Sequence, residues 1–73
     1  MAFKEYLEEH GVNQQWLARQ LDISYQALYV KLNGKGNFST KQAVKIKHLL
    51  RLTEEEFDSF FWVIVRGFYE RYF

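Results

Sequence analysis

The sequence predicts an all-α protein of five short helices, and two observations carry this prediction. Apolar residues recur at spacings of three and four in successive stretches of the chain, which is the period of a helix with one buried face. Short polar side chains that cap helix N-termini precede four of these stretches: Asn13, Ser24, Ser39 and Thr53. At 73 residues with 19% aromatic residues, the chain is expected to form one small domain with a dense aromatic core.

The first helix is expected over residues 2–10. Phe3, Tyr6, Leu7 and His10 fall on one face, and the charged side chains lie on the other: Lys4, Glu5, Glu8 and Glu9. Gly11 suits the position after a helix C-terminus, where the backbone often turns left-handed.

The stretch QQWLARQLDISYQALYVKLNG, residues 14–34, is expected to organise the rest of the chain. It contains two short apolar faces, the first made by Leu17, Ala18 and Leu21 and the second by Ala27, Leu28 and Leu32. Only Asp22 and Ile23 separate Leu21 from the cap Ser24. A link this short makes the helices cross steeply, so the stretch predicts a helix-turn-helix.

Two more helices are expected to follow. Ser39 with Gln42, and Thr53 with Glu56, have the spacing of capping boxes, so helices should begin at residues 40 and 54. The first of these should run to about residue 51, with four apolar residues inward: Ala43, Ile46, Leu49 and Leu50. The second has a helical stripe that continues nearly to the chain end: Phe57, Phe60, Phe61, Ile64, Val65 and Phe68.

The conformation after residue 60 has two interpretations. The helical stripe favours a helix to about residue 66. The β-branched and aromatic run over residues 61–65, followed by Gly67, instead favours a short strand. In a helix, a second apolar set would lie beside the inward stripe: Trp62, Val63, Tyr69 and Phe73. Because so small a domain cannot cover both sets, residues 60–73 are expected to form a homodimer or a partner contact.

Charge is strongly segregated along the chain. The net charge of +1 divides into −2 over residues 1–12, +6 over 13–51, −4 over 52–60 and +1 over 61–73. A basic centre between acidic flanks suits a polyanion or an acidic protein surface. Lys45 and Lys47 are interpreted as part of a solvated face.

Catalytic, metal and membrane functions find little support in the sequence. There is no cysteine, Ser24 and Ser39 fall at helix caps, and no glycine-rich phosphate loop is present. His10 and His48 are far apart and have no accompanying carboxylate, so neither a metal, a cofactor nor a small-molecule substrate is expected. The N-terminus is charged from residue 4, and the longest apolar run, residues 60–65, is far shorter than the ~20 residues that span a bilayer. A cytoplasmic protein that is not an enzyme is therefore expected.

Residues 14–34 resemble the DNA-binding unit of phage repressors of the lambda repressor, Cro and CI type. The likeness rests on Gln14 at the helix start, Ala18 within the first helix, and Asn33-Gly34 closing the second. Asp22 occupies a turn position where family members often have glycine, and aspartate tolerates the left-handed conformation there. The resemblance implies a five-helix lambda repressor-like domain over residues 1–60, with residues 61–73 as an extension for interactions.

The resemblance also implies which residues face a ligand. In this family the second motif helix enters the DNA major groove, which makes Tyr25, Gln26 and Tyr29 the base-facing residues. Gln26 suits adenine. Contacts at or near phosphates correspond to Gln14 and Asn33, and neighbouring lysines would join them: Lys31, Lys35 and Lys41.

The aromatic residues of the motif suggest a second function. Trp16 replaces a residue that is usually polar and outward in this family, so it either joins Tyr25 and Tyr29 in an exposed patch or is partly buried against the first helix. In size and aromatic face the chain is similar to small phage proteins called antirepressors or modulators of repression. The sequence therefore favours an antirepressor that binds the helix-turn-helix domain of a CI-type repressor, with a Cro-like operator-binding repressor as the alternative.

Overall fold

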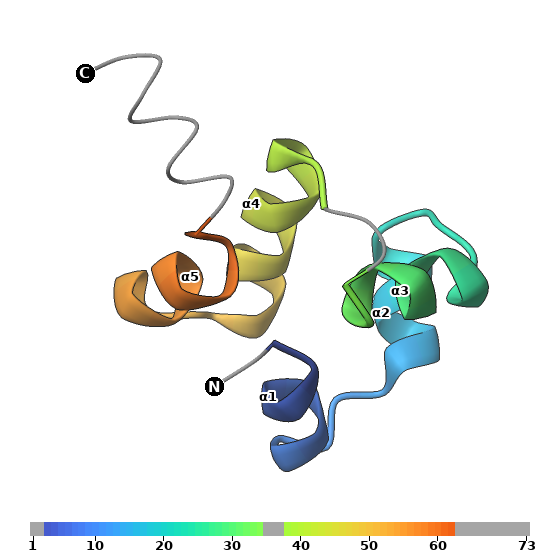
Figure 1. The fold of residues 1–73 in the computed structure, drawn as a ribbon, viewed down its shortest axis with the longest axis horizontal. Helices are drawn as coiled ribbons and strands as arrows, with labels where there is room; N and C mark the ends of the chain where they lie inside the picture. Colours follow the sequence, from blue (N-terminus) through green and yellow to red (C-terminus); the bar gives the residue numbers. More distant parts are fainter. Residues whose placement is uncertain (1–2, 35–37, 63–73) are drawn as a thin grey trace. The chain divides into compact units, whose positions relative to one another are not determined.

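The computed structural model describes residues 3–34 and 38–62, and within these ranges it is entirely helical, with no strand (Figure 1). The five helices are α1 (Phe3–Glu9), α2 (Gln14–Gln20), α3 (Tyr25–Leu32), α4 (Thr40–Leu50) and α5 (Glu54–Phe60). They are divided between two compact units, residues 1–38 and residues 39–73. The prediction of five helices is confirmed. Among the described residues, no helix has the length and apolar character needed to cross a membrane.

In unit one, α1 ends at a glycine in the left-handed conformation. Gly11 has φ +63°, and the N–H groups of Gly11 and Val12 donate to the carbonyls of Glu8 and Leu7, 3.2 and 2.9 Å away. This pair of bonds is a Schellman motif, which satisfies carbonyls that the helix leaves free. His10 lies just past the helix and is exposed, with its ring centroid 4.0 Å from that of Tyr6.

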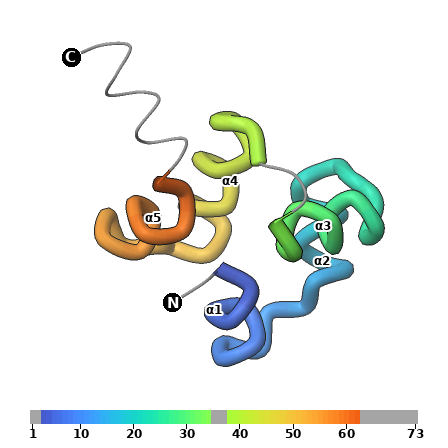
Figure 2. Tube along the Cα trace, in the orientation of Figure 1, coloured from blue at the N-terminus to red at the C-terminus, as the bar shows by residue number. Residues whose placement is uncertain are grey.

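The turn between α2 and α3 is built in the same way, with an aspartate in place of the glycine. Asp22 has φ +57°, its N–H donates to Arg19 O at 3.1 Å, and the next N–H, of Ile23, donates to Ala18 O at 3.0 Å. Ser24 then caps α3, because its Oγ accepts from Ala27 N–H at 3.1 Å. The two helices pack against each other across this tight connection (Figure 2).

Apolar residues from all three helices of unit one are buried. Leu7, Leu17 and Leu28 are fully enclosed. The ring of Phe38, at the end of the unit, meets Phe3 edge-on with centroids 5.9 Å apart.

In unit two, α4 and α5 both begin with the predicted capping boxes, Ser39 with Gln42 and Thr53 with Glu56. Arg51 ends α4 in the left-handed conformation, at φ +53°. Of the predicted inward residues of α4, Ala43 and Ile46 are buried, whereas Leu49 and Leu50 are only half-buried.

Helix α5 ends at Phe60, so the expected helix is interrupted at Phe61, and its expected continuation over residues 63–66 lies outside the described residues. Phe61 leaves the helical conformation, with φ −122° and ψ 32°. The residue is only 5% exposed, and its ring centroid lies 5.4 Å from that of Phe57 and 6.4 Å from that of Phe60. Burial of this large side chain stabilises the interruption at Phe61. The alternative of a strand concerns residues that extend beyond the described ranges.

Candidate interaction surface on α3

One side of α3 is exposed over its whole length. Its residues follow the spacing i, i+1, i+4, i+5 and i+8, and all are classed as exposed: Tyr25, Gln26, Tyr29, Val30 and Asn33. We call this set the α3 face. Exposed fractions are 45% for Tyr25, 53% for Tyr29 and 42% for Val30, values high for large apolar side chains. The face is therefore a patch that a partner can contact without any rearrangement of the core.

Local sequence features hold this face in place. The Ser24 cap begins the helix, so Tyr25 and Gln26 lie in its first turn. On the opposite side Leu28 is completely buried, which fixes the rotation of α3 about its axis. The exposed residues consequently share a rigid helical support.

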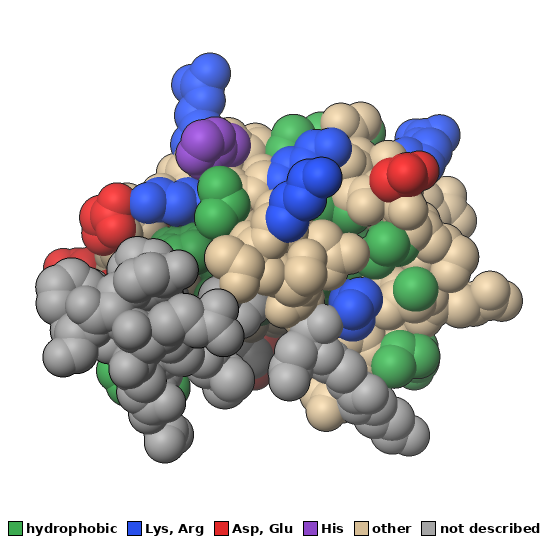
Figure 3. Space-filling model, turned by 90° about the horizontal axis from the view of Figure 1, so that it is seen from above, with side chains coloured by type: hydrophobic (Ala, Val, Ile, Leu, Met, Phe, Trp, Pro, Cys, Tyr) green, Lys and Arg blue, Asp and Glu red, His purple; other side chains and the backbone are tan. Residues whose placement is uncertain are grey.

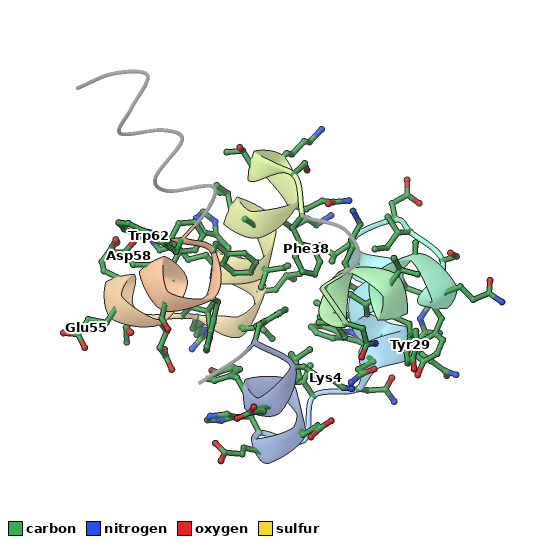
Figure 4. The ribbon with its side chains drawn as sticks, viewed as in Figure 1. Lys4, Tyr29, Phe38, Glu55, Asp58 and Trp62 are labelled. Carbon is green, nitrogen blue, oxygen red and sulfur yellow. The ribbon has the colours of Figure 1, made fainter. Side chains whose placement is uncertain are left out.

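The C-terminal end of the α3 face is tied to α1. The Nδ2 group of Asn33 donates to Tyr29 O at 2.8 Å, and Asn33 Oδ1 accepts from Lys4 Nζ at 3.3 Å. Lys4 reaches from α1 toward α3, the helix that carries Tyr29 (Figure 4). Asn33 was predicted to contact phosphate, and in the structure both polar groups of its side chain are engaged within unit one.

The other residues predicted to contact a ligand beside the α3 face differ in exposure. Gln14 and Trp16 are half-buried in the first turn of α2, so Trp16 lies between the two alternatives that its sequence position left open. Lys31 is also half-buried, and its Nζ lies 5.8 Å from the centre of the Phe38 ring. Lys41 is exposed in the first turn of α4, within unit two, and Lys35 lies outside the described residues.

The charge around the face is positive. Helices α2 and α3 contain Arg19 and Lys31 and no acidic residue, and the exposed acid nearest in sequence is Asp22 in the turn. Figure 3 shows one face of the molecule, on which lysine and arginine side chains stand clear of the surface and separate apolar and acidic side chains are also exposed. Two phenol groups, two amides and nearby cationic side chains suit a partner surface of mixed apolar and acidic character.

Another exposed aromatic residue, outside the α3 face, follows α5. Trp62 is 56% exposed, and in Figure 4 it lies with Glu55 and Asp58 on the outer side of α5. The predicted contact residues Val63 and Tyr69 fall outside the described part of the chain.

Two residues at this surface, Val30 and Lys4, were not among the predicted contact residues. Val30 lies between Gln26 and Asn33 on the exposed side, and its position four residues after Gln26 was a sufficient signal. Lys4 had no such signal, since 29 residues separate it from Asn33.

Comparisons with known proteins identify no relative. The sequence matches no protein-family model, and neither a curated protein nor a solved structure is significantly similar to it. No group of three or more His, Asp or Glu side chains that would hold a metal ion occurs in residues 3–34 and 38–62.

Proposed function

We propose that this chain is a regulator of a temperate phage lysis–lysogeny switch, and that it acts as an antirepressor. In this proposal the α2–α3 pair is a helix-turn-helix of the lambda repressor type. Its α3 face binds the helix-turn-helix domain of a CI-type repressor and thereby blocks operator binding.

The observation that carries the proposal is the exposure of Tyr25, Tyr29 and Val30 on a single rigid helix. Tyrosine is enriched at the centres of protein interfaces, where it contributes large contact area with little loss of side-chain entropy. Arginine, the residue that most often reads guanine, is absent from the α3 face. An aromatic face of this kind favours a protein partner over a base sequence.

A Cro-like repressor that binds operator DNA directly is the second candidate. Gln26 favours it, because this exposed amide lies in the first turn of α3, where residues of a recognition helix meet base edges. A glutamine that bonds both N6 and N7 of adenine would supply sequence discrimination.

A mobility-shift experiment with switch-region DNA distinguishes the two candidates. The chain is titrated onto the DNA alone and onto the complex of the DNA with its CI-type repressor. An antirepressor releases the DNA from the repressor and does not retard the DNA by itself. Specific retardation by the chain alone, lost with rising salt as phosphate contacts require, would replace the antirepressor proposal with the Cro-like one.

A further inference from the structure

Lys4 lies at the edge of the α3 face and makes no ion pair among the described residues. This holds although the sequence places it among Glu5, Glu8 and Glu9. Its hydrogen bond goes to the side-chain oxygen of Asn33, which is a neutral acceptor. An ammonium group has three donor hydrogens, so the bond to Asn33 leaves donors for a third group.

The position of this charge relative to the aromatic residues follows from the geometry of α3. Tyr25, Tyr29 and Asn33 are spaced four residues apart, so they follow one another along the same side of the helix. At 1.5 Å of rise per residue, Asn33 lies about 6 Å beyond Tyr29 along the axis and about 12 Å beyond Tyr25. Lys4, bound to Asn33, therefore marks the C-terminal end of the row of tyrosines.

We infer that Lys4 is a specificity-determining residue of the α3 face, whose ammonium group receives a carboxylate of the partner protein. This inference rests on the proposed function. It assigns to the partner an acidic side chain located one helical turn beyond the site that accepts Tyr29. Asn33 is the positioning residue, because it fixes Lys4 on one side and Tyr29 O on the other.

Stabilisation of α3 alone would be a simpler role for Lys4, since a cation near a helix C-terminus interacts favourably with the helix dipole. The two roles predict different measurements. A stabilising role changes the melting temperature and leaves the kinetics of partner binding unchanged in the folded variant. A role in recognition changes the association rate, and the change weakens as salt screens the charge.

The test compares Lys4→Met, which keeps the length of the side chain and removes its charge, with Lys4→Arg, which keeps the charge. Lys45→Met is the matched control, because Lys45 is an exposed lysine of α4 and its loss changes the net charge equally. Association and dissociation rates with purified repressor are measured at low and high salt, together with melting temperatures.

We expect Lys4→Met to weaken repressor binding roughly three- to tenfold at low salt, mostly through slower association, with the difference shrinking at high salt. Lys4→Arg should bind like the wild type, and Lys45→Met should differ by less than about twofold. Wild-type kinetics for Lys4→Met would overturn the inference and leave the proposed function intact. Equal losses in Lys4→Met and Lys4→Arg would also overturn it, because charge would then not be the cause.

Two further outcomes are informative. If the wild-type chain does not bind repressor at all, the proposed function fails and the inference fails with it. Lys4→Met could instead weaken binding to switch-region DNA and reduce the slope of log affinity against log salt concentration by about one. In that case the group that Lys4 receives is a phosphate, and the carboxylate assignment is overturned.

Discussion

The Nζ atom of Lys47 lies 2.7 Å from Oε1 of Glu54, so an ion pair joins the last turn of α4 to the first turn of α5. The two side chains are unequally exposed, at 27% for Lys47 and 80% for Glu54. The same ammonium group lies 5.1 Å from the centre of the Phe57 ring. Lys47 thus belongs to the packing of unit two, although its sequence context suggested a solvated face.

The stability contribution of this pair should come mainly from its lysine. Glu54→Gln should reduce the free energy of unfolding by less than about 1 kcal/mol, since exposed ion pairs are weak. Lys47→Ala should cost more, because it also removes the aliphatic stem and the cation over Phe57. Urea unfolding of both variants measures the two losses of unfolding free energy. A larger loss for Glu54→Gln than for Lys47→Ala would contradict the prediction.

Leu28 should be among the most sensitive positions of unit one. It is completely buried where α3 packs, so Leu28→Ala should cost ~2–5 kcal/mol by leaving a cavity. In a domain of this size such a loss approaches the whole stability. Val30→Ala is the control on the same helix, because Val30 is 42% exposed, and it should change stability by no more than about 0.5 kcal/mol. Thermal unfolding with similar midpoints for both variants would show that the inward side of α3 is assigned incorrectly.

The left-handed turn at Asp22 predicts opposite effects for two substitutions at one position. Asp22→Gly should leave stability unchanged or raise it by up to about 1 kcal/mol, because glycine adopts φ +57° without strain. Asp22→Val should lower stability by about 1–2 kcal/mol, since a β-branched side chain is strained at positive φ. Chemical denaturation measures both, and equal stability of the two variants would argue against the left-handed conformation.

Tyr29 should be a major contributor to repressor binding if the proposed function is correct. Tyr29→Ala should weaken the repressor complex by roughly thirtyfold or more, as expected for an aromatic anchor near the centre of an interface. Val44→Ala provides a control, because Val44 is an apolar side chain with 42% exposure on α4. Calorimetric titration against purified repressor measures the affinity of Tyr29→Ala and of the control Val44→Ala. Tight binding by the Tyr29 variant would exclude the α3 face as the contact surface.

Trp62 offers a test of the predicted contact through residues 60–73. Its side chain is 56% exposed, so Trp62→Ser should leave the melting temperature nearly unchanged in a monomer. If the segment mediates a homodimer or a repressor contact, the same change should weaken that association, and sedimentation equilibrium with and without repressor measures the effect. Identical sedimentation of the variant and the wild type would remove Trp62 from the contact.

How far the sequence predicts this molecule depends on the distance over which each interaction acts. The four helix caps, at Asn13, Ser24, Ser39 and Thr53, are present as predicted, because a cap joins residues only three positions apart. The left-handed conformation of Asp22 agrees with the expectation from the resemblance, in which glycine often occupies this turn position. The resemblance implied that Tyr25, Gln26 and Tyr29 face outward, and all three are exposed on α3.

Other features were decided only by tertiary structure. The interruption at Phe61 was one, since helical period favoured a helix through this residue, whereas its side chain is buried in a non-helical backbone conformation. The position of Lys4 was also decided by tertiary structure. Helical period assigned Lys4 to the solvated side of an acidic helix. The packing of α1 in unit one instead brings its ammonium group to the side chain of Asn33, on the α3 face. Periodicity specifies which side of a helix a residue occupies. Which distant residue lies beside it is set by the packing of helices far apart in sequence, and here that packing gives the α3 face its cationic end.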